Sequence, residues 1–501
     1  MGLGVGHLAA GLVSPAASPF VAVGGAAIDR TPSWLKDFAV RSFGTYDKVV
    51  LLLGMAVVIC GFAVAAGLLS RRSRTPGLVL LAALGVVAGA AVLSRPAADP
   101  LAWLPPLAAL LAGLWVFVNL HRLGRTGGRS GPGEAPAADP SGPAASGVAR
   151  RGFLVSSAAV AVGAGLTGAG GQALAGGGDV DTSRRAAGRI VAGARAPAIP
   201  AGADFAADGS PSFITPNRDF YRIDTNLIVP RLRAEDWRLR IHGMVDRELT
   251  LDWAALTSRP LVVRTVTMTC VSNEIGGSYI SNANFTGVPL SDILAEAGVR
   301  HGADQLVTTS VDGWTCGTPT AGVLDPARQA MLVIGMNSEP LPIEHGFPVR
   351  MLVPGLYGYV SGTKWLVDME FTTFEAKQAY WIERGWAQQA PIKTMSRIDR
   401  PGGFGEISPD SPLTGIAWAQ TRGIEKVEVR IDHGAWRVAE LSTEVSPDTW
   451  RMWRLPGRLP PGPHVAQVRA TDGTGYTQTE DRAAPIPDGA TGWHTVQFTV
   501  R

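Results

Sequence analysis

Long uncharged apolar runs dominate the first 180 residues of this 501-residue chain. The hydrocarbon core of a bilayer is about 30 Å thick, so an α-helix needs about 20 apolar residues to cross it. Five runs have about that length, the first being weaker because Pro15 and Pro19 interrupt it: 5–28, 49–69, 77–94, 101–120 and 153–175. So many runs favour membrane helices over buried helices of a large soluble core. The sequence predicts about five transmembrane helices in residues 1–180.

Charge is distributed unevenly along the chain. Only seven of the 42 Asp and Glu residues lie in the first 179 residues, and the net charge of +3 is small and spread out, so no nucleic-acid-binding face is predicted. Arginines gather in two loops of the apolar part, which the positive-inside rule places in the cytoplasm. These are Arg71, Arg72 and Arg74 in one loop and Arg122, Arg125, Arg129, Arg150 and Arg151 in the other. The region after residue 180 is therefore predicted to lie outside the cytoplasm, on a multi-pass membrane protein.

The last apolar run begins with a recognisable pattern. Arg150-Arg151 followed by Gly-Phe-Leu and a mild Ala/Gly-rich run resembles a twin-arginine export signal, a route for folded proteins. Simple anchoring by positive charge is the alternative interpretation. Ala173-Leu174-Ala175 resembles a signal-peptidase site, which leaves cleavage after Ala175 open. Residues 125–149 and 181–211 are predicted to be linkers.

From residue 212 the pattern changes to that of a globular protein. Residues 212–400 contain short β-like runs mixed irregularly with short helical segments, which is typical of an α+β domain. Residues 401–501 are predicted to be all-β. In Lys426–Asp432 and again near the C-terminus apolar and polar residues alternate, with turn residues between the strands. This pattern predicts an immunoglobulin-like β-sandwich.

The three cysteines have no zinc, haem-attachment or iron–sulfur spacing. Cys270 stands at the end of a β-run and the start of a Gly-rich turn, where its thiolate could ligate a metal or attack as a nucleophile. A small buried cysteine is the structural alternative. A Cys270–Cys316 disulfide is a second alternative in an oxidising compartment. Cys60, within an apolar run, is interpreted as a packed small residue.

Four motifs in order resemble the molybdopterin-dependent sulfite oxidase family. They are residues 215–222 (TPNRDFYR), 265–290 around Cys270, 345–355 (HGFPVRMLVPG) and Lys364-Trp365. The resemblance covers roughly residues 212–501, including the β-sandwich. It implies a molybdenum–molybdopterin cofactor, which is loaded in the cytoplasm and so agrees with an export route for folded proteins.

The resemblance also implies roles for individual residues. Cys270 would be the protein ligand to molybdenum, because a thiolate donates charge to a high-valent metal. Arg350 and Lys364 would bind the pterin phosphate, and His345 and Asn217 would hydrogen-bond the pterin. The remaining residues implied to contact the cofactor are Phe220, Tyr221, Ser272 and Asn273. Two catalytic positions of the family correspond to Arg222, for which an ungapped alignment gives Asp224, and to Trp386, where the family has a tyrosine.

Oxygen-atom transfer on a small sulfur compound is the implied reaction, with oxidation of sulfite to sulfate as the family activity. The substrate pocket departs from the family, because Asn273, Glu274 and Ile275 replace arginines and Phe285 replaces a pocket tryptophan. A sulfoxide reductase on the same cofactor is therefore the alternative, and a surface binding module that has lost the cofactor is a further one. A separate cytochrome or quinone is predicted to exchange electrons with the site. A homodimer through the C-terminal domain is implied by analogy.

Overall fold

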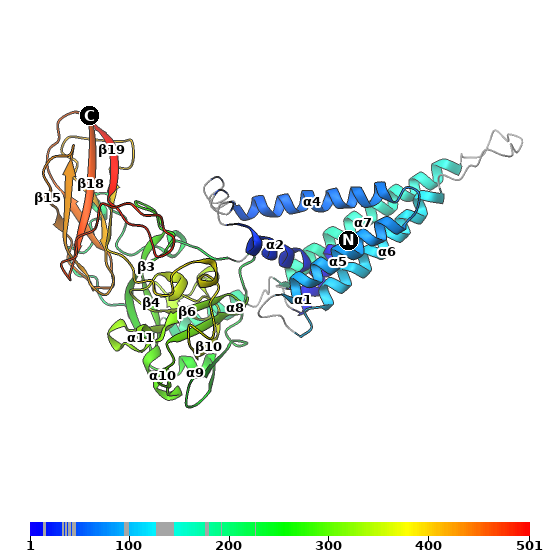
Figure 1. The fold of residues 1–501 in the computed structure, drawn as a ribbon, viewed down its shortest axis with the longest axis horizontal. Coiled ribbons are helices and arrows are strands. Elements are labelled where there is room, and N and C mark those ends of the chain that lie inside the picture. The colour runs from blue at the N-terminus through cyan, green and yellow to red at the C-terminus, as the bar shows by residue number, and fades with distance from the viewer. Residues whose placement is uncertain are drawn as a thin grey trace, which may run out of the picture. The chain divides into compact units, whose positions relative to one another are not determined.

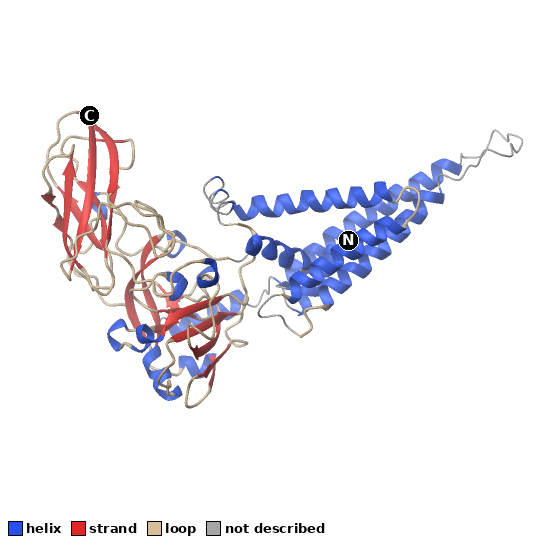
Figure 2. Ribbon diagram, viewed as in Figure 1, coloured by secondary structure: helices blue, strands red, loops and turns tan. Residues whose placement is uncertain are grey.

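A computed structural model describes residues 1–13, 17–32, 35, 38, 42, 47–94, 100–126, 145–175, 180–191, 193–225 and 227–501. The chain forms two compact units. Unit 1 comprises Met1–Gly178 together with Asn226–Arg231, and unit 2 comprises Asp179–Thr225 together with Leu232–Arg501. Helices make up unit 1, whereas unit 2 contains the strands (Figures 1 and 2). The residue-180 boundary in composition therefore separates two folded bodies.

Unit 1 contains four helices that are long and apolar enough to cross a membrane, consistent with membrane association. They lie at Val49–Leu69, Thr75–Leu93, Leu104–Leu123 and Gly152–Gly171. The full helices are α4 (Asp47–Leu69), α5 (Thr75–Leu93), α6 (Leu104–Thr126) and α7 (Ala145–Ala175).

The weakest apolar run does not form a fifth long helix. Residues 5–28 fall instead into two helices of 12 residues, α1 (Gly2–Val13) and α2 (Pro19–Arg30). Proline has no backbone N–H and suits the first turn of a helix, and Pro19 stands there in α2. Each helix is too short to span a hydrocarbon core of about 30 Å.

Small residues let α1 pack closely against its neighbours. A Cβ added to Gly4 would lie 2.8 Å from the Ala164 carbonyl oxygen of α7, and one added to Gly6 would lie 2.7 Å from the Ala109 Cβ of α6. Close backbone approach through glycine is the usual way in which membrane helices associate. α1 is therefore wedged between α6 and α7.

The predicted outer linker is wrong over its first part. Residues Val180–Val191 form α8, whose apolar side contributes Val180, Ala187 and Val191 to the buried interior of unit 2. Arg184 anchors the helix by donating to the carbonyl oxygens of Leu341 and Pro340, both at 2.8 Å. An amphipathic helix with an apolar stripe packs rather than remaining flexible.

Other predicted segments lie partly outside the described residues. Of the predicted cytoplasmic linker 125–149, residues 127–144 are not described, and neither are the side chains of Arg150 and Arg151. α7 includes the candidate cleavage residues 173–175, whose side chains are likewise outside the description.

Within the predicted domain 212–400, strands β1 to β10 and short helices form two sheets, which is the α+β content that was predicted. One sheet has the order β2 (Leu249–Asp252), β1 (Arg238–Gly243), β10 (Leu366–Thr372), β5 (Gln305–Ser310) and β6 (Thr315–Pro319). The other has the order β3 (Val262–Thr269), β4 (Ile280–Pro289), β7 (Met331–Met336) and β8 (Glu339–Pro340), with β9 (Arg350–Leu352) also paired to β7. Short helices lie between the strands: α9 (Trp253–Thr257), α10 (Leu290–Ala297) and α11 (Thr320–Leu324).

The C-terminal part is all-β. One sheet runs β11 (Met395–Arg400), β13 (Leu413–Trp418), β17 (Arg451–Leu455) and β16 (Glu440–Leu441). The other runs β12 (Gly405–Ile407), β19 (His494–Val500), β18 (Gly462–Asp472), β14 (Ile424–Ile431) and β15 (Arg437–Val438). Side chains of both sheets, among them Trp453, Val429 and Phe498, share one buried cluster. Because apolar and polar residues alternate along the strands, the apolar side chains of each strand point toward the other sheet.

Candidate functional site

Cys270 lies at the tip of the β3–β4 hairpin. Its backbone N–H donates to the Tyr279 carbonyl oxygen at 3.0 Å, which closes a loop over residues 270–279. Asn273 is buried and its Oδ1 accepts from the Tyr279 backbone N–H at 2.8 Å, so this side chain holds the loop in shape. Burial raises the pKa of the Cys270 thiol, while the backbone amide and hydroxyl of Ser272, which hydrogen-bond to it, act in the opposite direction. The loop thus presents one thiol with its own hydrogen-bond donors.

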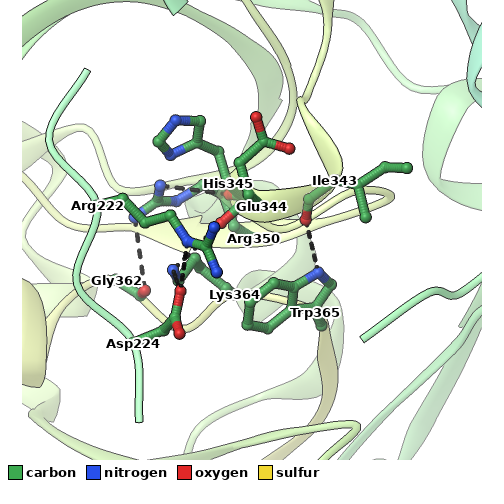
Figure 3. Close-up of polar contacts among 9 residues, drawn as sticks. All are labelled: Arg222, Asp224, Ile343, Glu344, His345, Arg350, Gly362, Lys364 and Trp365. Atoms are coloured by element: carbon green, nitrogen blue, oxygen red, sulfur yellow. Dashed lines mark hydrogen bonds and ion pairs between the residues drawn. The ribbon is translucent and has the colours of Figure 1, made fainter. Parts of the chain in front are cut away.

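A second group of residues brings basic side chains together (Figure 3). His345 ends the 3₁₀ helix η6 (Ile343–His345), Arg350 begins β9, and Lys364 precedes β10. Arg350 donates to the carbonyl oxygens of His345 at 3.4 Å and Gly362 at 3.5 Å, and Lys364 donates to that of Glu344 at 3.2 Å. Gly346 has φ +110°, and a Cβ there would lie 3.0 Å from the Lys364 Cβ. Only glycine therefore suits the turn that lets η6 approach Lys364.

One carboxylate enters this cluster. Asp224 Oδ2 lies 2.7 Å from Arg222 Nε and 3.3 Å from Lys364 Nζ, and its side chain is only 4% exposed. Arg222 and Asp224, the two candidate matches to the family arginine, therefore form an ion pair with each other. We call Arg222, Asp224, His345, Arg350 and Lys364 the basic cluster.

The basic cluster carries more buried positive charge than its own partners neutralise. Burial lowers the pKa of Arg350 to about 10, and that of Lys364 to about 8 although Asp224 opposes the effect. Burial, with the charges of Arg350 and Lys364, lowers the pKa of His345 to about 3, so this imidazole is neutral at pH 7. Arg350 Nε is buried and has no hydrogen-bond partner among the residues that the structure describes. Buried cations with an unsatisfied donor are costly unless an anion binds them, and phosphate is the anion that arginine suits best.

Tyr221 connects the thiol to the basic cluster. Burial raises the pKa of the Tyr221 phenol, and the charge of the Cys270 thiolate raises it further, whereas the charge of Arg350 lowers it. Both groups therefore influence the Tyr221 phenol. Tyr221 stacks on Phe220 with 5.4 Å between ring centroids, and Phe220 meets His345 edge-on, also at 5.4 Å. The backbone of Asn217 hydrogen-bonds to His345. The structure therefore brings Asn217, Phe220 and Tyr221 together with the basic cluster, and the charge of Cys270 reaches Tyr221.

Two residues matched to the substrate pocket lie elsewhere in the packing. Phe285 is fully buried behind Phe220, at 6.0 Å between ring centroids, so it does not line an open pocket. The ring contacts of Trp386 within the described chain are with Tyr359 at 5.6 Å and Trp381 at 6.2 Å. Neither contact joins Trp386 to the basic cluster.

Several residues near Cys270 gave no sequence signal. Tyr357 is buried, and burial raises its pKa to about 12, with a contribution from Cys270. Arg397 donates to the Gly277 carbonyl oxygen at 2.7 Å, and a Cβ on Gly276 would lie 2.3 Å from His494 Nε2. The backbone N–H of Ile398 donates to His494 Nδ1 at 3.0 Å, which leaves the proton of the neutral ring on Nε2, beside the Cys270 loop. Residues of the C-terminal sheets thus support this loop.

The disulfide alternative is wrong. All three cysteines are free, with Cys316 fully buried on β6 and its sulfur 3.7 Å from Thr318 Oγ1. Cys270 therefore keeps a thiol that can bind a metal.

Comparison with known proteins gives a consistent result. Residues 226–381 match the family described as "Oxidoreductase molybdopterin binding domain". Human mitochondrial sulfite oxidase is 29% identical over 345 residues, covering 58% of this chain and 62% of that protein. An uncharacterized oxidoreductase of Bacillus subtilis, YuiH, is 33% identical over 150 residues, covering 30% of this chain and 72% of that protein. This chain belongs to the sulfite oxidase family of molybdopterin-dependent oxidoreductases.

A solved structure supports the same fold. The sulfane dehydrogenase SoxCD of Paracoccus pantotrophus aligns with a TM-score of 0.50 at 23% identity, covering 61% of this chain and 88% of that one. The chain spans about 62% of the length of the mammalian sulfite oxidases that it matches. The match shows an oxidoreductase-type molybdopterin-binding domain in this chain. The unsatisfied Arg350 and the cations beside it are what a phosphate-bearing pterin requires, so the site fits this cofactor.

Proposed function

We propose that this protein catalyses oxygen-atom transfer on a small sulfur compound, in the direction of sulfite oxidation to sulfate. The observation that carries the proposal is the buried, incompletely neutralised basic cluster, whose Arg350 lies close to the end of β3 just before Cys270. A Cβ on Gly362 would lie 3.0 Å from Arg350 Nη2 and 3.3 Å from the Met268 Cε. When bound, the molybdenum cofactor supplies two-electron oxygen-atom transfer between water and sulfur.

Each residue of the site has a proposed task. Cys270 ligates the metal, and the amide and hydroxyl of Ser272 hold its sulfur in place while Asn273 fixes the loop. Arg350 and Lys364 bind the pterin phosphate. Neutral His345 and Asn217 hydrogen-bond the pterin, and the stacked Phe220–Tyr221 pair forms an aromatic wall beside it. Phosphate binding needs cations, hydrogen bonding to the pterin needs neutral polar groups, and contact with the pterin ring needs a flat apolar surface.

Reduction of a sulfoxide is the second candidate. Arg222, the match to a substrate arginine, is already paired with Asp224 at 2.7 Å, which lowers its capacity to hold a dianion such as sulfite. Glu274 in the Cys270 loop would repel an anion. The phenols of Tyr221 and Tyr357, whose pKa values are both raised by burial and by Cys270, stay protonated at pH 7 and are suited to donate hydrogen bonds to a sulfoxide oxygen. The ring contacts of Trp386 among the described residues, with Tyr359 and Trp381, do not support a catalytic role for this side chain.

The arrangement of the whole protein is also a proposal. The four apolar helices anchor it as a multi-pass membrane protein, and the arginine loops favour an outward-facing catalytic unit exported through the twin-arginine route. The C-terminal sheets make an immunoglobulin-like sandwich, through which two copies form a homodimer. A cytochrome or a quinone exchanges electrons with the site.

Metal content and two assays test the function. The full chain from a host competent in cofactor synthesis is expected to hold about one molybdenum per chain, and Cys270→Ser is expected to lose it. Cys316→Ser, at a buried thiol away from the loop, serves as the matched control and should keep the metal. Absence of molybdenum from the wild-type chain would overturn the proposal. Two rates decide between the reactions: oxidation of sulfite with ferricyanide as the electron acceptor, and reduction of methionine sulfoxide with reduced viologen as the electron donor.

A further inference from the structure

A cavity of about 460 Å³ opens within unit 1. The residues that line it come from α1, α2, α4 and α7 and from the segment 227–228: among them are Leu3, His7, Phe20, Leu52, Leu227 and Ile228. Residues 227–231 belong to unit 1 although their neighbours in the sequence belong to unit 2. The cavity is therefore built by helices of unit 1, two short and two long enough to cross a membrane, together with the segment 227–228.

The lining has the character of a site for an apolar ligand with a polar head. Pockets of 300–1,000 Å³ with apolar walls and a few placed polar groups are typical of small-molecule sites. His7 is the polar side chain among the described lining residues. A 3.0 Å hydrogen bond between its Nδ1 and the hydroxyl of buried Ser18 fixes the ring. A histidine can hydrogen-bond a carbonyl and pass a proton.

The sequence ties this cavity to the basic cluster. Leu227 follows Asp224 by three positions in the chain, a stretch that extends over at most about 11 Å. On the other connection, Gly168 of the lining lies seven residues before α7 ends at Ala175, which is about 10 Å along the helix. Two of the three connections between the units therefore start close along the chain to residues that line the cavity.

We infer that the cavity binds the head group of a lipid-soluble quinone, which exchanges electrons with the catalytic site. The inference rests on the proposed function, because that reaction releases electrons in pairs. Sulfite and water give sulfate, two protons and two electrons, and the quinone takes up both protons and both electrons to become a quinol. His7 hydrogen-bonds a quinone carbonyl. The membrane unit is then the electron-acceptor site of the enzyme as well as its anchor.

Two glycines of α7 provide a matched test. A Cβ added to Gly168 or to Gly165 meets no atom within 4 Å, so both positions accept a side chain, but only Gly168 lines the cavity. The full chain in phosphatidylcholine nanodiscs is titrated with decyl-benzoquinone, with empty discs as background. We expect Gly168→Leu to weaken binding at least tenfold and Gly165→Leu to leave it unchanged. Equal binding by the two variants, or no binding above empty discs, would overturn the inference.

Two further measurements separate the occupants and the two proposals. Decylbenzene has the same chain without carbonyls, so equal competition by it would show an acyl-chain pocket and would also overturn the inference. Sulfite turnover is then measured with decyl-benzoquinone and with ferricyanide, and the ratio of the rates should fall at least tenfold in Gly168→Leu. Turnover with ferricyanide but not with the quinone refutes the quinone site alone. Failure with ferricyanide refutes the proposed sulfite oxidation, while the binding measurement still decides the cavity.

Discussion

Replacing Arg350 with methionine is expected to stabilise the cofactor-free protein and to abolish its retention of the cofactor. Arg350 is 4% exposed, its Nε lacks a hydrogen-bond partner within the described part of the chain, and its two hydrogen bonds are long, at 3.4 and 3.5 Å. Burial lowers its pKa from 12.5 to about 10, which corresponds to a cost of about 3 kcal/mol for the charged form at 1.36 kcal/mol per pKa unit. Methionine fills similar space without that cost.

The net gain is smaller, because methionine gives up both hydrogen bonds, each contributing about 0.5–1 kcal/mol at these lengths. We expect a gain of about 1–2 kcal/mol and a rise of a few degrees in Tm. The bound phosphate would lose charge-assisted hydrogen bonds of about 1.5–3 kcal/mol each, so cofactor affinity should fall at least tenfold.

The assay compares two preparations of the full chain. Thermal unfolding is followed in protein from a host that cannot make the cofactor, and molybdenum content in protein from a competent host. Arg451→Met is the matched control, because Arg451 donates to the carbonyl oxygens of Ser442 at 2.9 Å and Ile424 at 2.7 Å and should lower Tm when replaced. If Arg350→Met lowers the Tm of the cofactor-free protein as Arg451→Met does, Arg350 braces the fold and the reasoning is refuted.

Three further predictions concern pH and the Cys270 loop. The pKa of His345 is lowered to about 3 from 6.5, so the unfolded chain binds the extra proton and the free energy of unfolding falls as pH drops from 6.5 toward 3. His345→Asn should reduce this pH dependence, measured by urea unfolding, and an unchanged slope between pH 6.5 and 3 would contradict the prediction. Lys364, with a pKa of about 8, should lose its charge above pH 8, so inorganic phosphate should bind the cofactor-free protein more weakly there by calorimetry. Asp224 raises that pKa, so Asp224→Asn should move the decline to lower pH, and a decline at unchanged pH would argue against the ion pair. Gly276→Ala, at φ +75° and against His494, should lose molybdenum, whereas Gly402→Ala, which meets nothing within 4 Å, should keep it; equal metal content would refute a role for that turn.

Patterns that are local in the chain could be predicted from the sequence. The long apolar runs, the alternation in the C-terminal strands and the motifs around Cys270, His345, Arg350 and Lys364 depend on neighbouring residues or on fixed spacings. The molybdopterin cofactor was predicted from the resemblance of these motifs to a known family. The linker prediction failed over α8 because the residues that hold this helix in unit 2, among them Leu341 and Ala234, lie far from it in the sequence.

Only the tertiary structure decided what surrounds those motifs. Asp224 reaches Lys364 across 140 residues, Arg397 reaches Gly277 across 120, and His494 stands against Gly276 from another domain. Such contacts depend on how separate elements pack, and the burial that packing produces lowers the pKa of Arg350 and Lys364. The sequence by itself determined that a thiol, cations and helices long and apolar enough to cross a membrane are present. The fold decided which charges are neutralised and which are left for a cofactor to meet, because burial and long-range pairing exist only once the chain has packed.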